Sequence, residues 1–193
     1  MVEKLIVPLT RAEMPDVAAG VTAVLSPVLG AAGRDGPVKA VLELTGDRDG
    51  ADRVAGRIEP ATGPGVPAPG WFRERVVIGG DPAEAGVKLC YWITRLGSLS
   101  LEDFDTYWAE THAGVARHIP DVVRYVQSLR VDAVASHDGI AEMWWRDVET
   151  QQAAMRTRQT RTAMEDERNF IDHGSVLPLV VGWGGGDVAA AAD

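Results

Sequence analysis

The sequence predicts an α+β protein made of two ferredoxin-like β-α-β-β-α-β units that close into a pseudo-dimeric barrel within one chain. The second half of the chain shows strand and helix patterns in that order, and the first half fits the same order with weaker elements. A short repeat supports two related units. Lys4-Leu5 and Thr10-Arg11 recur as Lys88-Leu89 and Thr94-Arg95, offset by 84 positions. Each unit would leave one sheet face bare, and the two bare faces can bury each other.

The first half, residues 1–80, is expected to be a degenerate ferredoxin-like unit. Val2 to Leu9 is rich in β-branched and aliphatic residues, which favours a strand. Apolar residues at helical spacing then predict a helix over Met14 to Leu29, which ends at Gly30. The remaining expected elements are strands at 38–44 and 71–78, a short helix at 51–58, and a linker or lid at 59–70 that is rich in proline and glycine.

The second half, residues 81–183, opens with a strand over Val87 to Thr94 and continues with the clearest helix of the sequence, Ser98 to Ile119. Ser100 can cap this helix, and Pro120 ends it. One face of the helix is apolar because hydrophobic residues recur at steps of three and four, namely Leu101, Phe104, Trp108, Val115 and Ile119.

Two strands, Val122 to Val131 and Gly139 to Trp145, follow as a hairpin or a close pair. Asp147 to Arg168 favours a helix that breaks near Thr160 and restarts at Thr162, with Glu165 completing a capping box. A last strand is expected at 176–181, and residues 184–193 are expected to be a flexible tail.

The charge and composition of the chain argue against nucleic acids and membranes as partners. The 193 residues carry a formal net charge of -9, which repels nucleic-acid phosphates and anionic membrane surfaces. Apolar runs are far shorter than the roughly 18 to 20 residues that span a bilayer, and the amino terminus does not resemble a signal peptide, so we expect a cytoplasmic protein. The single cysteine, Cys90, allows neither an internal disulfide nor a multi-cysteine zinc site.

Aromatic residues point to the second half as the functional part, because ten of the twelve follow Lys88. His112 lies four residues after Trp108, at the edge of the apolar helix face. Two interpretations stay open for it. It is either a core histidine bonded to a backbone carbonyl or a general acid or base, since partial burial keeps the pKa of an imidazole near neutrality.

The other ionisable candidates are weaker. His118 complements the dipole at the end of its helix, His137 lies in a turn, and His173 could close the rim of a pocket. Glu142 stands on an otherwise apolar strand, where it is either a second catalytic group or the partner of Arg95 or Arg124. Metal-ligand spacing is missing among the histidines, and nucleotide fingerprints are absent, so no metal or cofactor is expected.

Several segments of the second half form a recognisable set. They are Lys88-Leu-Cys-Tyr-Trp-Ile-Thr-Arg95, Leu101-Glu-Asp-Phe-Asp-Thr-Tyr-Trp108, His112, Arg124-Tyr-Val126, Asp138-Gly-Ile-Ala-Glu-Met-Trp144 and Glu165 to Asp172. Together they resemble the EthD family of dimeric α+β barrel proteins. The resemblance covers Lys88 to Val181, whereas the first half lacks the helix aromatics and the histidine. It implies a pocket between the sheet and the helices of one unit. Related barrels include cofactor-free cyclases, dehydratases, isomerases and monooxygenases, so the fold leaves the reaction open.

The resulting hypothesis is a protein that binds a small hydrophobic, aromatic or polyketide-like molecule and acts on it by acid–base catalysis. His112 and Glu142 are the predicted catalytic residues. The predicted substrate-binding residues are Tyr91, Trp92, Trp108, Tyr125, Trp144 and His173. A non-catalytic accessory or binding protein is the alternative, and haem or metal binding is a third one. The protein is either a monomer with an intramolecular barrel or a homodimer.

Overall fold

The computed structural model describes residues 2–30, 35–184 and 188–190. Within these ranges, strands pair into one antiparallel sheet in the order β8-β5-β7-β6-β4-β1-β3-β2-β9. The strands are β1 (Glu3–Leu9), β2 (Val21–Pro27), β3 (Ala40–Gly46), β4 (Gly70–Gly79), β5 (Val87–Ile93), β6 (Arg124–Arg130), β7 (Gly139–Trp145), β8 (Leu177–Gly182) and β9 (Val188–Ala190).

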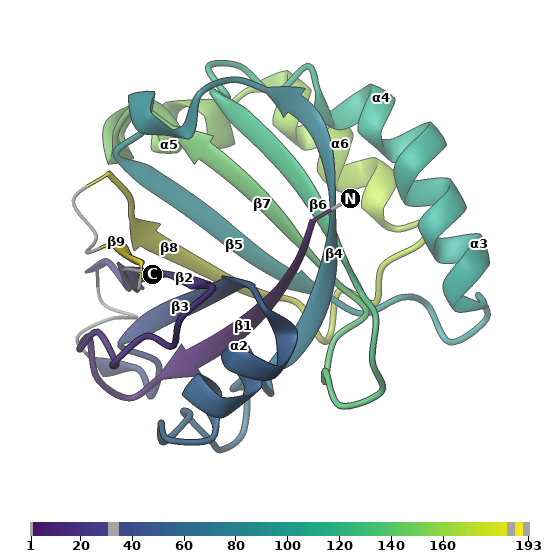
Figure 1. Ribbon diagram of the computed structural model, residues 1–193. Coiled ribbons are helices and arrows are strands. Elements are labelled where there is room, and N and C mark those ends of the chain that lie inside the picture. The colour runs from purple at the N-terminus through teal and green to yellow at the C-terminus, as the bar shows by residue number, and fades with distance from the viewer. Residues whose placement is uncertain (1, 31–34, 185–187, 191–193) are drawn as a thin grey trace.

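Helices cover the outside of this sheet. In Figure 1, α2 lies beside the strands of the first half, and α3, α4 and α6 lie together on the side of the second half. A π-helical turn, Tyr107–His112, joins α3 to α4 without a break in the chain's helical path. The helices are α2 (Arg48–Ala55), α3 (Leu101–Thr106), α4 (Ala113–Ala116), α5 (Val148–Met155) and α6 (Arg158–Glu167), with a short 3₁₀ turn at Pro82–Glu84.

The strand order confirms the predicted pair of ferredoxin-like units. The first unit is ordered β4-β1-β3-β2, and the second is ordered β8-β5-β7-β6, which is the same arrangement. The units join where β4 pairs with β6. At the opposite side Val28 bridges to Val181, and the Leu29 amide donates to the Val180 carbonyl at 2.8 Å. The sheet therefore curls into a nearly closed barrel within one chain.

The predicted helix over Met14 to Leu29 is wrong. Residues 12–18 have no regular structure, and the stretch ends in strand β2 instead. Gly20 has φ +74° and turns the chain beside Gly46, where a β-carbon would lie 2.1 Å from the Gly20 carbonyl oxygen. After this turn, buried residues alternate with more exposed ones from Val21 to Leu25. This period of two is typical of a strand, and the segment forms β2 in spite of its helical spacing of apolar residues.

The helix break in the second half falls earlier than predicted. The chain leaves α5 at Arg156, and the Thr157 hydroxyl caps α6 by accepting from the Thr160 amide at 3.3 Å. Thr162 therefore lies inside α6 and starts no new helix.

The expected linker or lid at 59–70 and part of the expected flexible tail at 184–193 are paired with the rest of the molecule. In the 59–70 segment, the Ala61 amide donates to the Pro8 carbonyl at 2.8 Å and the Ala68 amide donates to the Ser136 hydroxyl at 2.9 Å. Of the expected flexible tail, Val188–Ala190 pairs with β2, while 185–187 and 191–193 lie outside the described residues.

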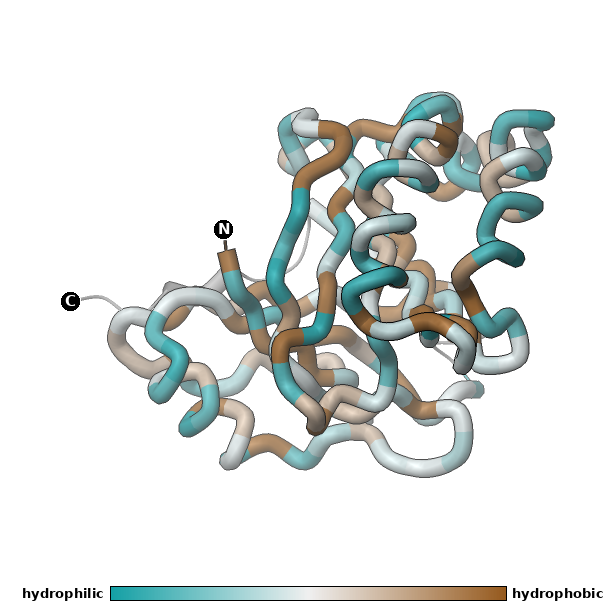
Figure 2. The backbone as a smooth tube through the Cα atoms, turned by 90° about the vertical axis from the view of Figure 1, so that its right-hand side faces the viewer, coloured by the Kyte–Doolittle hydropathy of each residue, from teal (hydrophilic) through white to brown (hydrophobic). Residues whose placement is uncertain are grey.

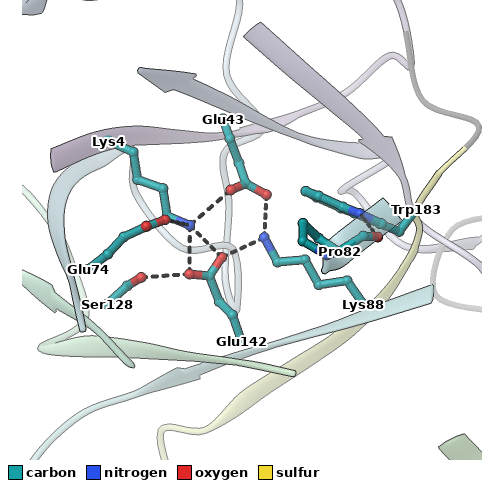
Figure 3. A network of polar contacts seen from close by, with 8 residues as sticks. All are labelled: Lys4, Glu43, Glu74, Pro82, Lys88, Ser128, Glu142 and Trp183. Carbon is teal, nitrogen blue, oxygen red and sulfur yellow. Dashed lines mark hydrogen bonds and ion pairs between the residues drawn. The ribbon is translucent and has the colours of Figure 1, made fainter. Parts of the chain in front are cut away.

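Charged side chains of both units meet in the barrel interior, as Figure 3 shows. Four of them are deeply buried, and the fifth, Glu74 of β4, is 18% exposed and lies 2.8 Å from the Lys4 ammonium. We call Lys4, Glu43, Lys88 and Glu142 the charge cluster; each is at most 6% exposed. The Lys4 ammonium lies 2.9 Å from Glu43 and 2.7 Å from Glu142. Lys88 pairs with the same two glutamates, at 2.5 Å from Glu142. Each lysine thus links a carboxylate of its own unit to one of the other unit.

The charge cluster follows the internal repeat. Lys4 and Lys88 are the lysines of the repeated pair, and Glu43 and Glu142 face Ile6 and Cys90 across their ladders, positions that are again 84 apart. Burial by itself raises the pKa of Glu142, but the charges of the two lysines outweigh it and lower that pKa below its ordinary value. The charged state is therefore stable only as a complete set.

Polar and apolar residues alternate along the trace in Figure 2, as expected for strands and helices that each bury one side. None of the helices in the described ranges is both long and apolar enough to cross a membrane.

Replacing one member of the charge cluster should lower the unfolding free energy of the protein. In Lys88→Met, Glu43 and Glu142 would share Lys4 with Glu74, and a buried, uncompensated carboxylate costs about 3 to 5 kcal/mol of unfolding free energy. Urea denaturation at neutral pH measures the loss. The matched control neutralises the whole cluster together with Glu74, as Lys4→Met, Glu43→Met, Glu74→Gln, Lys88→Met and Glu142→Gln, and should recover most of it. A loss under about 1 kcal/mol in Lys88→Met would mean that the cluster does not constrain the barrel.

Candidate functional site

A cavity of about 80 Å³ lies between the sheet and the helices of the second unit. Apolar side chains make up most of its wall, and the ionisable ones are few. The wall residues come from β5, β6, β7, the π-helical turn, α5, α6 and the segments that follow α4 and α6, namely Leu89, Tyr91, Ile93, Trp108, His112, Ile119, Tyr125, Ala141, Met143, Met155, Thr160, Ala163, Met164, Glu167 and Ile171. Apolar walls with a few convergent polar groups are typical of small-molecule sites.

Strand alternation separates the cavity from the charge cluster. Along β5, Leu89, Tyr91 and Ile93 face the cavity, whereas Lys88 and Cys90 face the barrel interior. The sequence left this choice of face open. The cavity and the cluster therefore lie on opposite sides of one sheet layer.

The π-helical turn places His112 in the cavity wall. Trp108 fits against Gly139, where a β-carbon would lie 2.6 Å from the indole ring. Gln127 holds the same turn from β6, because its side-chain amide donates to the Trp108 carbonyl at 2.8 Å. π-Helical turns often occur at functional sites, where the extra residue re-aims side chains.

His112 is 4% exposed and is oriented by a carboxylate. Its Nδ1 lies 2.8 Å from Asp166 Oδ2, and its ring packs 4.8 Å from the ring of Phe170. Burial lowers the pKa of His112, while the hydrogen bond and charge of Asp166 act in the opposite direction. The imidazole is therefore neutral near pH 7, with its proton on Nδ1, and Nε2 is the ring nitrogen left for a ligand.

Asp166 is itself fixed by neighbouring donors. The Tyr107 hydroxyl donates to Asp166 Oδ1 at 2.8 Å, and the Asn169 side-chain amide donates to the same oxygen at 3.2 Å. Burial alone would raise the pKa of Asp166, but the hydrogen bonds from His112 and Tyr107 lower it. Asp166 is thus a stable anion that can favour a positive charge on His112.

Glu167 is the second ionisable group in the cavity wall. It is 8% exposed, and the Tyr91 hydroxyl donates to its Oε2 at 3.2 Å. Burial raises the pKa of Glu167 to about 7, and the negative charge of Asp166 adds to the rise, while the Tyr91 hydrogen bond opposes it. At neutral pH this carboxyl group therefore exists in both protonation states.

The structure brings together several of the predicted site residues. His112, Tyr91, Trp108 and Tyr125 line the cavity. His173 lies at its rim, with Nε2 3.8 Å from Glu167 Oε2 and a side chain that is 40% exposed.

Three predicted site residues do not face the cavity. Trp92 and Trp144 point from β5 and β7 into the barrel interior, where Trp144 lies beside Lys88. Glu142 belongs to the charge cluster, so the prediction that it shares a proton with His112 does not fit its position. Its expected partners were also wrong, because Lys4 and Lys88 pair with it in place of Arg95 or Arg124.

Asp166 and Glu167 were missed at the sequence level. One signal was available for Glu167, which follows Ala163 by four residues and Thr160 by seven and so shares the buried face of α6. Across 2–30, 35–184 and 188–190, His, Cys, Asp and Glu side chains form no group of three that could hold a metal ion.

Comparison with known proteins confirms the EthD resemblance for the second unit. Residues 97–174 match the model of the EthD domain, a segment that contains His112, Asp166 and Glu167. A solved structure from Bacillus halodurans C-125 is described as an ethyl tert-butyl ether d (ethd) family protein. It is 23% identical to this chain, with a TM-score of 0.43, and the match covers 49% of this chain and 95% of that one. No curated protein matches the sequence.

Two solved structures share the fold over nearly the whole chain. An anthrone oxidase-like protein is 10% identical, with a TM-score of 0.64, and the match covers 99% of this chain and 96% of that one. A protein of Lactobacillus acidophilus NCFM, provisionally named a monooxygenase, is also 10% identical, with a TM-score of 0.53 and coverage of 97% and 98%. At such low identity the likeness extends to the fold alone.

The raised pKa of Glu167 predicts a pH-dependent stability difference. The folded protein holds this proton up to about pH 7, whereas the unfolded chain loses it near 4.5. Stability from this group is therefore present below pH 4.5 and is lost as pH rises to about 7. The side chain of Glu167→Gln stays neutral at every pH. The unfolding free energy of this variant, relative to that of the wild type, should therefore rise over that pH range by up to about 3 kcal/mol.

Urea denaturation of both proteins across this pH range measures the difference. Glu165→Gln removes the same formal charge from the exposed side of α6 and is the matched control. A wild-type to Glu167→Gln difference that stays constant with pH would contradict a buried, neutral carboxyl group.

Proposed function

We propose that this chain, whose residues 97–174 match the EthD domain, binds a small apolar molecule in the cavity of its second unit and moves a proton on it. The observation that carries the proposal is the pair of ionisable groups in an otherwise apolar wall. Their pKa values are shifted in opposite directions, since burial lowers that of His112 and raises that of Glu167. Such pairs supply the acid and the base of a proton-transfer reaction.

In the proposed reaction, His112 is the base and Glu167 is the acid. Nε2 of neutral His112 removes a proton from a carbon next to a carbonyl group of the ligand, and the Asp166 carboxylate stabilises the imidazolium that forms. Protonated Glu167 delivers its proton to a second atom of the ligand. The product is an isomer, and proton exchange with solvent returns both groups to their starting states.

Tyr91 and Tyr107 act as positioning residues in this scheme. The Tyr91 hydroxyl holds the Glu167 carboxyl group at 3.2 Å, and Tyr107 holds Asp166 at 2.8 Å. Isomerisation, cyclisation and dehydration all require a proton to leave one atom and another to arrive nearby, so the site supports that reaction class without selecting a member.

A non-catalytic binding protein is the alternative, in which the same cavity holds a ligand and His112 serves the packing with Phe170. Binding and proton transfer therefore need separate measurements on the same protein.

Methionine methyl groups provide a direct binding assay. Met143, Met155 and Met164 line the cavity, whereas Met14 lies in the first unit. A small cyclic ketone such as cyclohexanone, titrated into methyl-labelled protein, should shift the NMR signals of the three cavity methionines and leave Met14 unchanged. Unmoved cavity signals across a panel of such ketones would contradict binding.

Proton transfer is measured on the same ketones as exchange of their acidic hydrogens for deuterium in heavy water. His112→Ala and Glu167→Gln should each slow this exchange by about 100-fold or more, the usual contribution of a general acid or base. His137→Ala, a histidine of the β6–β7 turn, is the control and should leave the rate unchanged. Retained methyl shifts without any protein-dependent exchange would favour the non-catalytic alternative.

A further inference from the structure

A groove on the outside of α6 adjoins the cavity at Met164. We call Arg161, Met164, Glu165, Arg168 and His173 the cationic groove. Met164 lines both the cavity and the groove, and His173 approaches Glu167 of the cavity wall at 3.8 Å. A ligand that fills the cavity and extends past Met164 would therefore reach the groove.

Two arginines dominate the charge of this groove. Arg161 on α6 and Arg168, the residue that ends this helix, are seven positions apart, which puts their Cα atoms on one helix face about 10 Å apart. Both are exposed, and neither guanidinium group makes an ion pair or hydrogen bond to any residue of the described chain. Glu165 is the one carboxylate among the groove residues, so the two arginines leave an excess of positive charge.

This local excess contrasts with the chain as a whole, whose formal net charge is -9. Some arginines elsewhere are neutralised by carboxylates, as Arg75 is by Asp105 at 2.7 Å and Arg95 by Asp138 at 2.5 Å. Unpaired guanidinium groups at the mouth of an apolar cavity offer the two parallel donors that a carboxylate accepts.

We propose that the natural ligand is a small carboxylic acid, with its apolar part in the cavity and its carboxylate on the arginines of the cationic groove. This inference rests on the proposed function, since it assigns a ligand class to the same cavity. The groove sets specificity through charge, while the cavity wall accepts the apolar part through burial. Glu165 limits the acid to a position beside Arg161 or Arg168, away from its own carboxylate.

The test compares acids with neutral molecules of the same shape. Phenylacetate and the two longer acids of the same series are titrated against their primary amides, with the methyl signals of Met155 and Met164 as the readout. At least one acid should bind about tenfold more tightly than its amide, the gain of about one charge-assisted contact. High salt should reduce this preference.

Variants assign the preference to the groove. The double variant Arg161→Gln with Arg168→Gln should bring the affinity for the acid down to that for the amide and leave the amide unchanged. Arg158→Gln, which removes the same charge from the start of α6 in a different surface depression, should leave both affinities unchanged.

Each result decides between the two proposals. Equal affinity for acids and amides, or an acid preference that survives the double variant, overturns the carboxylate assignment and leaves the proposed function standing. Cavity methionines that respond to no acid, no amide and no ketone overturn the proposed function, and this inference with it.

Discussion

The charge cluster is the constraint on which the rest of the structure depends. Lys4, Glu43, Lys88 and Glu142 come from four strands and two units, and each lysine pairs with one carboxylate of its own unit and one of the other unit. An isolated buried charge is strongly unfavourable, whereas a complete set with short contacts is tolerated. The cluster therefore favours one register and one face for each of these strands.

Because the charge cluster fixes which face of each strand points into the barrel, it also fixes which face points toward the helices. With Lys88 and Glu142 turned into the barrel, their strand neighbours Leu89, Tyr91 and Met143 must face the helices, because successive side chains alternate. The cavity is thus the reverse side of the charge cluster. His112 and Glu167 then reach it from the helical layer, where low exposure shifts their pKa values in opposite directions.

Much of the fold could be predicted from the sequence, because the second unit has clear strand patterns and one strongly amphipathic helix. The repeat of Lys4 and Lys88 even marked the two cluster lysines, without revealing that they meet. The helix expected at Met14 to Leu29 failed because Pro15 and Gly20 break the helical spacing and a period of two takes over at β2.

The site was harder to predict for a physical reason. The period of two in β5 and β7 separates the two faces of each strand, but it does not indicate which face points into the barrel and which points toward the helices. Glu142 and Trp144 were therefore predicted to lie in the same pocket as Tyr91. Only the partner charges Lys4 and Glu43, more than 40 positions away from Lys88, resolve that choice. Glu167 was missed because its helix was expected to restart at Thr162, which hid the face it shares with Thr160 and Ala163.

The central claim is that the EthD-like cavity holds a carboxyl group that titrates near neutrality. Carbon NMR of the side-chain carboxyl groups, assigned for Glu167 by comparison with Glu167→Gln, measures this directly as a function of pH. The structure predicts a titration midpoint for Glu167 near pH 7. A midpoint at the ordinary value of 4.5 or below would contradict the claim and remove the proposed acid from the site.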